Sequence, residues 1–459
     1  MLTYSLEQRG NLPLYAYLYV CIRKDILSGV LPPDTRLPSK RALSEHLGVS
    51  VVTVETAYQQ LEAEGYVYAR PRRGVFVSKV ERVLPAPPSA PEIPAMPVRH
   101  DRLDLTRNRI SSNQFPSAAW ARLTRQVLSE GGLLSPVPHQ GLPELRQAIA
   151  EDLRARKGMA VSADQIIIGA GAEYLYLLLA QLLGRDTVLA VEDPGYPKIR
   201  QIYEKWGTPC RPIPLDAQGL PPERLGDAGA VHLSPSHHYP TGLMTPIARR
   251  QALLRWAEQT GSHIIEDDYD SEFRFTGRPL PTLQSIDRTG RVIYMNTFSQ
   301  TISPSMRLGF MVLPPELLEQ YRKELYFYSC TVSALDQHVL ARFLKSGDYS
   351  RHISRMRKTY RIRRSKVLNA FRNSKFSDRM TIFEQGVGLH FLLHLDTCKS
   401  DGELRRHAES LGVRLAFLSE YAAVPKSVYD HTLVVNYAGL DEDALPETMS
   451  LLETVFSTL

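Results

Sequence analysis

The stretch Ile265-Glu-Asp-Asp-Tyr-Asp-Ser-Glu-Phe273 bears most directly on the fold, because a short apolar run ends in it and a cluster of carboxylates begins. The run starts at His263 and has the length of a buried strand. Similar apolar runs lie at Ile166–Ile168, Val188–Val191, Ala230–Leu233 and Val292–Tyr294. Helical patterns, such as those at 172–183 and 246–259, separate these runs. The alternation predicts an α/β domain with a mostly parallel sheet and helices on both faces, and the mixed pattern after Val387 predicts a smaller α+β domain.

A proline-rich segment separates this part of the chain from a shorter module in front of it. Six prolines, at 85, 87, 88, 91, 94 and 97, fall between Glu81 and His100. Such a segment cannot hold a helix and behaves as a semi-rigid spacer. We therefore expect three parts: a front module over residues 1–79, a linker over 80–103 and a large module over 104–459.

Length and composition limit the class of protein. A chain of 459 residues is too long for one hydrophobic core. No apolar run approaches the length of a membrane span, and the N-terminus lacks a signal-peptide pattern. The four cysteines form no CxxC pair. These observations predict a cytoplasmic protein without a membrane partner and without a structural metal site.

The front module has the element order of a winged helix-turn-helix. Helical patterns cover 14–27 and 39–47, and a third helix begins after Ser50, which is a good N-cap. In this third helix Val54, Ala57, Tyr58 and Leu61 form one apolar stripe. Two short strands, at 66–69 and 75–78, then flank a basic turn that ends at Gly74.

Three motifs in this module resemble the N-terminal domain of GntR-type bacterial regulators. They are Thr35-Arg-Leu-Pro-Ser-Lys-Arg41, Leu47-Gly-Val-Ser-Val-Val-Thr-Val54 and Leu61-Glu-Ala-Glu-Gly65. The resemblance implies binding to double-stranded DNA, with the third helix in the major groove and the wing near the minor groove. The implied DNA-binding residues are Arg36, Ser39, Arg41, Ser50, Thr53, Thr56 and Gly74. Val51 departs from the arginine that often follows the serine, which leaves the target sequence open. A winged helix used for protein contact is the alternative.

Several motifs of the large module are similar to fold-type I pyridoxal-phosphate (PLP) aminotransferases. They are His139-Gln-Gly-Leu-Pro-Glu-Leu-Arg146, Gly169-Ala-Gly-Ala-Glu-Tyr174, Glu192-Asp-Pro-Gly-Tyr-Pro197, Ser234-Pro-Ser-His-His-Tyr-Pro-Thr-Gly242, Ile265–Phe273 and Tyr294–Phe310. The resemblance implies that Tyr196 stacks on the pyridine ring, Asp267 pairs with its nitrogen and Tyr269 binds its hydroxyl. It also implies a phosphate cradle made by Gly171, Ala172, Thr297, Ser299 and Arg307.

Departures from the aminotransferase pattern indicate that the chemistry is lost. Gln300 stands at the position of the lysine that bonds covalently to the cofactor, and an amide nitrogen is no nucleophile. Val434 stands where an arginine for the substrate carboxylate is usual. Glu173 adds a negative charge beside the expected phosphate. We therefore assign no catalytic residue and expect at most non-covalent PLP.

A winged helix joined to this module is similar to the MocR/GabR subfamily of GntR regulators. The resemblance implies a homodimer whose aminotransferase-like domain senses a small-molecule effector. The leading hypothesis is a DNA-binding transcriptional regulator with a degenerate aminotransferase-like domain. One alternative is an active PLP-dependent aminotransferase, and another is a large module that serves only for dimerisation. The basic run from Arg351 to Lys366 is interpreted as a solvated or interface face of a helix.

Overall fold

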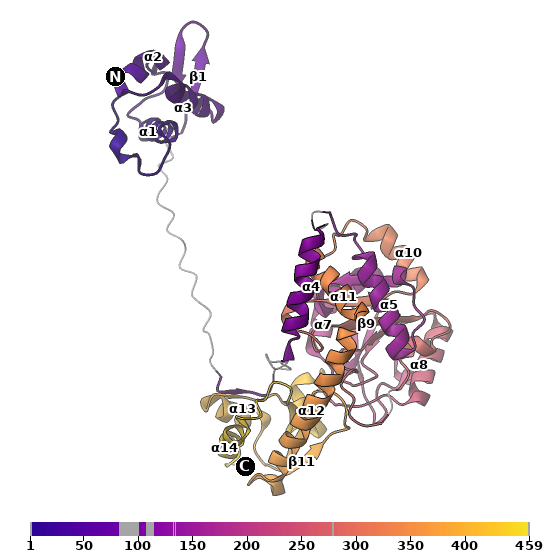
Figure 1. Cartoon of the computed structure of the whole chain (residues 1–459). Coiled ribbons are helices and arrows are strands. Elements are labelled where there is room, and N and C mark those ends of the chain that lie inside the picture. The colour runs from indigo at the N-terminus through magenta and orange to yellow at the C-terminus, as the bar shows by residue number, and fades with distance from the viewer. Residues whose placement is uncertain are drawn as a thin grey trace. The chain divides into compact units, whose positions relative to one another are not determined.

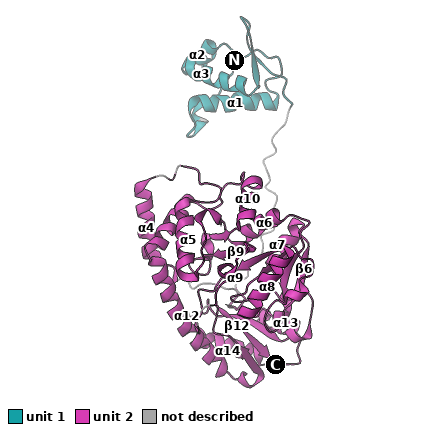
Figure 2. Ribbon diagram, turned by 90° about the vertical axis from the view of Figure 1, so that its right-hand side faces the viewer, with its two compact units in different colours: residues 1–98 teal, residues 99–459 magenta. Residues whose placement is uncertain are grey.

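The chain is built as two compact units, residues 1–98 and residues 99–459 (Figure 2). The computed structural model describes residues 2–81, 101–106, 114–131, 133, 135–277 and 280–457. Most of the expected linker, residues 82–100, lies outside the described residues. The limits 1–79, 80–103 and 104–459 therefore stay predictions.

The first unit is a small helical domain with a two-stranded wing. Its elements are η1 (Leu6–Arg9), α1 (Leu14–Ser28), α2 (Lys40–Leu47), α3 (Val51–Ala63), β1 (Val67–Arg70) and β2 (Gly74–Val77). The stripe of α3 is buried as expected, and it packs with Leu18, Ile22 and Ile26 of α1. Strands β1 and β2 pair antiparallel, and Arg36 adds an isolated bridge to Phe76. The expected winged helix is confirmed.

The second unit is built on a seven-stranded sheet in the order β4-β10-β9-β8-β7-β5-β6. The strands are β4 (Ile166–Gly169), β5 (Leu189–Asp193), β6 (Cys210–Pro214), β7 (Ala230–Leu233), β8 (His263–Asp267), β9 (Val292–Thr297) and β10 (Gly309–Val312). Only β10 runs antiparallel to its neighbours, β4 and β9. The expectation of a mostly parallel sheet is confirmed.

Helices bury both faces of this sheet, which is why consecutive positions of its strands are apolar, as in Ile166, Ile167 and Ile168 of β4. On β4, Ile166 and Ile168 pack with α4 (Ser117–Glu130), α5 (Pro143–Lys157) and α11 (Ala334–Lys345). Ile167 points to the other face, where it packs with α6 (Ala172–Leu183) and α10 (Pro315–Glu324). The remaining helices of this domain are α7 (Pro197–Trp206), α8 (Ile247–Thr260) and α9 (Leu283–Ile286).

The C-terminal part forms the smaller α+β domain. Its antiparallel sheet has the order β11-β12-β14, with β11 (Met380–Phe383), β12 (His390–Leu395) and β14 (Thr432–Asn436). Strand β13 (Val413–Arg414) pairs parallel with β3 (Leu103–Asp104). Helices α13 (Asp401–Ser410) and α14 (Leu445–Phe456) cover this domain. The 25-residue α12 (Asp348–Arg372) runs between the two domains (Figure 1).

No described helix combines the length and the apolarity that crossing a bilayer requires. Within the same described residues, no group of three or more His, Cys, Asp or Glu side chains is placed to hold a metal ion.

The buried face of α8 gives a test of the packing. Leu253 is 0% exposed and shares its apolar cluster with Trp256. Leu253→Ala is expected to lower the free energy of unfolding of this domain by about 2–5 kcal/mol, because it leaves a cavity. Tryptophan fluorescence during urea unfolding measures the change. The neighbouring exposed Gln251→Ala is the control, and an equal effect of both variants would contradict the packing described.

Candidate functional site

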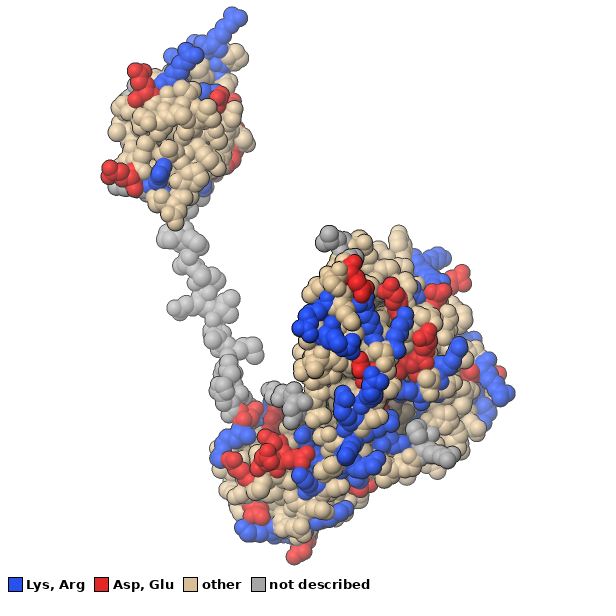
Figure 3. Space-filling view, viewed as in Figure 1, with Lys and Arg blue, Asp and Glu red and all other residues tan. Residues whose placement is uncertain are grey.

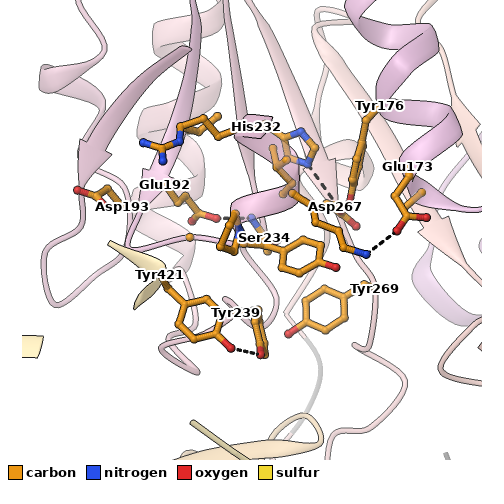
Figure 4. A pocket seen from close by; sticks show the side chains of 18 of the residues that line it. Glu173, Tyr176, Glu192, Asp193, His232, Ser234, Tyr239, Asp267, Tyr269 and Tyr421 are labelled. Carbon is orange, nitrogen blue, oxygen red and sulfur yellow. Dashed lines mark hydrogen bonds and ion pairs between the residues drawn. The ribbon is translucent and has the colours of Figure 1, made fainter. Parts of the chain in front are cut away.

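A pocket of about 550 Å³ lies at the carboxyl ends of β5, β7, β8 and β9 (Figure 4). Ligands commonly bind at this edge of parallel sheets. The structure brings most of the predicted cofactor residues together here: Ala172, Tyr196, Asp267, Tyr269, Thr297, Ser299 and Arg307 all line the pocket. Gln300 lines it too. Gly171 is placed beside it through its contact with Arg307.

Asp267 is the last residue of β8 and is 5% exposed. Tyr176 of α6 donates a hydrogen bond of 2.5 Å to its Oδ2, and Nε2 of His232 lies 3.5 Å from the same oxygen. Both contacts involve Oδ2, so Oδ1 of Asp267 has no side-chain partner within the described part of the chain and can accept a hydrogen bond from a protonated ring nitrogen. Sequence reasoning missed Tyr176, although it lies one helical turn after Ala172.

Tyrosine side chains form one side of the pocket (Figure 4). The rings of Tyr196 and Tyr239 meet edge to face at 5.9 Å, and the hydroxyls of Tyr239 and Tyr421 lie 2.9 Å apart. Tyr196 is 37% exposed, so its face is free to stack. The hydroxyl of Tyr269 lies 3.2 Å from Nδ1 of His237. An incoming ring hydroxyl would therefore compete with this histidine for Tyr269.

The expected phosphate end of the pocket is built by a close approach between Gly171 and Arg307. Gly171 precedes α6 with φ +85°, and a Cβ there would lie 2.7 Å from Nη2 of Arg307. Arg307 itself has φ +48°, a left-handed conformation that is uncommon for a residue with a side chain. Only glycine therefore lets the guanidinium lie against the N-terminus of α6.

Glu173 occupies the anion position at this end. One carboxylate oxygen pairs with Nη2 of Arg307, and the other lies 2.9 Å from Nζ of Lys198. Burial acts to raise the pKa of Glu173, but the hydrogen bond from Lys198 and the charge of Arg307 outweigh it and lower the pKa. The three side chains are 37–54% exposed, and exposed ion pairs contribute only about 0–1 kcal/mol each. A phosphate dianion can therefore displace Glu173 at small cost.

Gln300 presents a polar group that the surrounding protein does not satisfy. Its Oε1 is buried and has no hydrogen-bond partner among the described residues. An unsatisfied buried acceptor costs about 1–3 kcal/mol. The atom therefore favours a ligand that brings a donor.

Val434 lies in β14 and is 1% exposed. It packs with Leu392 and Leu418, and Tyr239 and Tyr421 lie against this small cluster. The position is filled by apolar contacts that support the tyrosine side of the pocket.

Five carboxylates within seven residues, beginning with the last two of β8, are all at most 5% exposed: Glu266, Asp267, Asp268, Asp270 and Glu272. Each has a different set of partners. Lys157 at the end of α5 lies 2.5 Å from Asp268 and 3.4 Å from Glu272, and Nδ1 of His237 lies 2.8 Å from Asp270. From the sequence, a role was assigned only to Asp267 of this set. The partners of the others are distant in the sequence and could not be predicted from it; Lys157, for example, lies 111 positions from Asp268.

In the front unit, the predicted DNA-binding residues lie on α2, α3, the turn before α2 and the wing. Ser39 and Ser50 cap α2 and α3 and accept hydrogen bonds from the amides of Ala42 and Thr53. The hydroxyl of Thr53 lies 2.8 Å from that of Ser50, and the hydroxyl of Thr56 donates to the carbonyl of Val52. To donate a hydrogen bond to DNA, the hydroxyl of Thr56 has to give up its bond to the carbonyl of Val52, and Thr53 has to rearrange its contact with Ser50.

The basic residues expected to approach DNA are exposed. Arg36 lies against the wing glycine, with its Nε 3.1 Å from where a Cβ of Gly74 would be, and Arg41 is exposed on α2. Arg72 and Arg73 lie in the hairpin turn, and basic side chains gather at the hairpin tip (Figure 3).

Both parts of the chain match known families. Residues 14–77 match the gntR family of bacterial regulatory proteins, and residues 101–397 match the aminotransferases of class I and II. The chain is 36% identical to the HTH-type transcriptional regulator YhdI of Bacillus subtilis, covering 100% of this chain and 99% of the relative. It is 32% identical to the probable rhizopine catabolism regulatory protein MocR of Rhizobium meliloti, covering 99% and 96%.

Among solved structures, kynurenine aminotransferase of Pyrococcus horikoshii superposes with a TM-score of 0.68. The identity is 24%, over 78% of this chain and 92% of that one, so this likeness concerns the fold. The chain belongs to the MocR/GabR-type GntR regulators, in which a helix-turn-helix domain is fused to an aminotransferase-like domain.

Glu192 lines the pocket and gives a test of its electrostatics. Burial raises its pKa from 4.5 to about 8, against the hydrogen bond from the backbone amide of Ser234. The protonated form stabilises the folded state fully below pH 4.5, and this contribution is lost as pH rises through 8. The melting temperature of Glu192→Gln relative to the unchanged protein is therefore expected to rise between these pH values, by a few °C. Thermal melts of both proteins across this range measure it; parallel profiles would contradict the assignment.

Proposed function

We propose that this protein is a cytoplasmic, homodimeric, DNA-binding transcriptional regulator whose aminotransferase-like domain binds a small ligand without catalysing transamination. The observation that carries the proposal is Gln300 in the same pocket as Asp267, Tyr196 and Arg307. Residues suited to hold a pyridine ring and a phosphate are present, while the group at the covalent position is an amide.

PLP fits the pocket at its ring end. Asp267 has an oxygen available for the ring nitrogen, Tyr196 offers a face for stacking, and Tyr269 lies near the expected ring hydroxyl. The phosphate end fits once Glu173 releases Arg307, and the amides at the start of α6 then complete the cradle. When bound, PLP supplies an electron-withdrawing ring and an aldehyde that reacts with amines.

At the expected covalent position the pocket carries the amide of Gln300. The nitrogen of Gln300 is delocalised into its carbonyl. Lys198 lines the pocket, and this observation supports an active aminotransferase as the second candidate function. However, Glu173 holds the ammonium of Lys198 at 2.9 Å, and its hydrogen bond raises the pKa of Lys198. A protonated, paired amine favours ligand binding over catalysis.

Added PLP is expected to bind with a saturable change in absorbance and a higher melting temperature, yet to leave no label on the chain after borohydride reduction. Gln300→Lys is expected to become labelled under the same conditions, because it introduces a primary amine at the covalent position. Mass spectrometry measures the label. Labelling of the unchanged protein at Lys198, or conversion of PLP to its amine form with amino acids, would instead support the aminotransferase.

Removing the competing carboxylate tests the phosphate end in the same titration. Glu173→Gln frees Arg307 and Lys198 and is expected to tighten PLP binding by roughly tenfold, about 1.4 kcal/mol. Glu204→Gln, an exposed change on α7, is the control. Equal affinity of both variants would show that Glu173 does not compete.

In the front unit, Arg41→Gln is expected to weaken binding to random-sequence duplex DNA and to reduce the slope of log K against log salt concentration by about one, because one phosphate contact is lost. Fluorescence anisotropy at several salt concentrations measures the slope. Arg9→Gln, on η1, is the matched control. If both variants keep the unchanged slope, Arg41 does not contact phosphate.

A further inference from the structure

A second cavity, of about 420 Å³, lies behind the loop that follows β8. The end of α5, the middle of α12 and the loops around Ser236 and Pro281 also line it. The lining is strongly basic: five Lys or Arg residues face one acidic residue, Glu272, among the described lining residues. The basic residues are Arg156, Lys157, Arg250, Arg274 and Arg357.

Three of these five cations already have partners that account for their presence. Lys157 pairs with Asp268 and Glu272, and Arg156 pairs with Asp152. Arg250 is 0% exposed and donates to three backbone carbonyls. These residues are part of the framework.

Arg274 differs, because no carboxylate of the described residues lies within 4.0 Å of its guanidinium. Its Nη1 lies 2.8 Å from the sulfur of Met244, which is a weak acceptor. Its Nε is buried without a hydrogen-bond partner in the described structure. The guanidinium of Arg274 therefore has one weak acceptor and no carboxylate partner within the described structure.

Arg357 of α12 is in a similar state. Its Nε donates to the backbone carbonyl of Glu272 at 2.5 Å. Its two terminal nitrogens pair with no carboxylate in the described part of the chain. The carboxylate of Glu272 is engaged by Lys157 and Arg156, so Arg357 shares the field of this one negative charge with two other cations.

We propose that this cavity is a second ligand site, specific for a small phosphate-bearing molecule. Two guanidinium groups that pair with no carboxylate of the described residues match a dianion, and their N–H donors match a group with three acceptor oxygens. The hydroxyl of Ser236 adds a further donor to the same cavity. The volume suits a small metabolite, since ligand sites span about 300–1,000 Å³.

The loop that follows β8 contributes residues to both cavities. Tyr269 lines the first cavity, and Ser271, Glu272 and Arg274 of the same loop line the second. The backbone of Arg274 also bridges to Val387 of the smaller domain. A ligand in the second cavity would therefore contact the same loop that contributes Tyr269 to the first.

Thermal melts and calorimetry of the full chain with inorganic phosphate test this site, with sodium chloride keeping the ionic strength constant. We expect saturable stabilisation of the unchanged protein. Arg274→Gln and Arg357→Gln are each expected to weaken phosphate binding at least tenfold. Arg361→Gln, an exposed change on the same helix as Arg357, is the control and is expected to bind as the unchanged protein does.

The variant Arg307→Gln distinguishes phosphate binding in the second cavity from binding in the first pocket, which Arg307 lines. It is expected to keep the phosphate binding that depends on Arg274. Because Arg274 has no carboxylate partner, Arg274→Gln is expected to melt at or above the temperature of the unchanged protein without phosphate, which shows that it folds. Phosphate binding lost only in Arg307→Gln, or no effect beyond ionic strength, would overturn the proposal.

Discussion

This domain depends on the burial of five carboxylates, two at the end of β8 and three in the loop that follows it: Glu266, Asp267, Asp268, Asp270 and Glu272. An uncompensated carboxylate in a protein interior costs several kcal/mol, so each needs a partner from elsewhere in the fold. Glu266 receives backbone amides at the start of α9, Asp267 receives the hydroxyl of Tyr176, and Asp268 receives Lys157. Helices α5, α6 and α9 are therefore tied to one sheet edge, and that edge is where the pocket forms.

The pocket combines a well-supported ring end with an anion end that the protein itself fills. At the ring end, two buried aromatic residues, Tyr176 and His232, contact Asp267. At the anion end, Glu173 forms partly exposed ion pairs with Arg307 and Lys198. The buried contacts hold Asp267 rigidly, whereas solvent weakens the ion pairs of Glu173. A site of this kind suits reversible occupancy, which is what a sensor requires.

Sequence reasoning succeeded where the physics is local or periodic. Ser39 and Ser50 were expected to cap helices because their hydroxyls reach the amides three residues on, and they do. The buried stripe of α3 follows from helical spacing. The apolar runs predicted strands of the sheet, since helices cover both of its faces and make most strand positions apolar. The roles expected of Tyr196 and Tyr269 toward a ligand stay predictions.

Local patterns in the chain thus determined the helices, the strands, the order of the two units and which residues follow each strand, because caps, spacing and apolar runs act over a few residues. Tertiary structure alone decided the pairings: Glu173 with Arg307 across 134 positions, and Lys157 with Asp268 across 111. It also left Arg274 facing a thioether in a basic cavity. Such pairings depend on where strands and helices meet in space, and electrostatic partners are chosen by distance through space, whatever their separation along the chain.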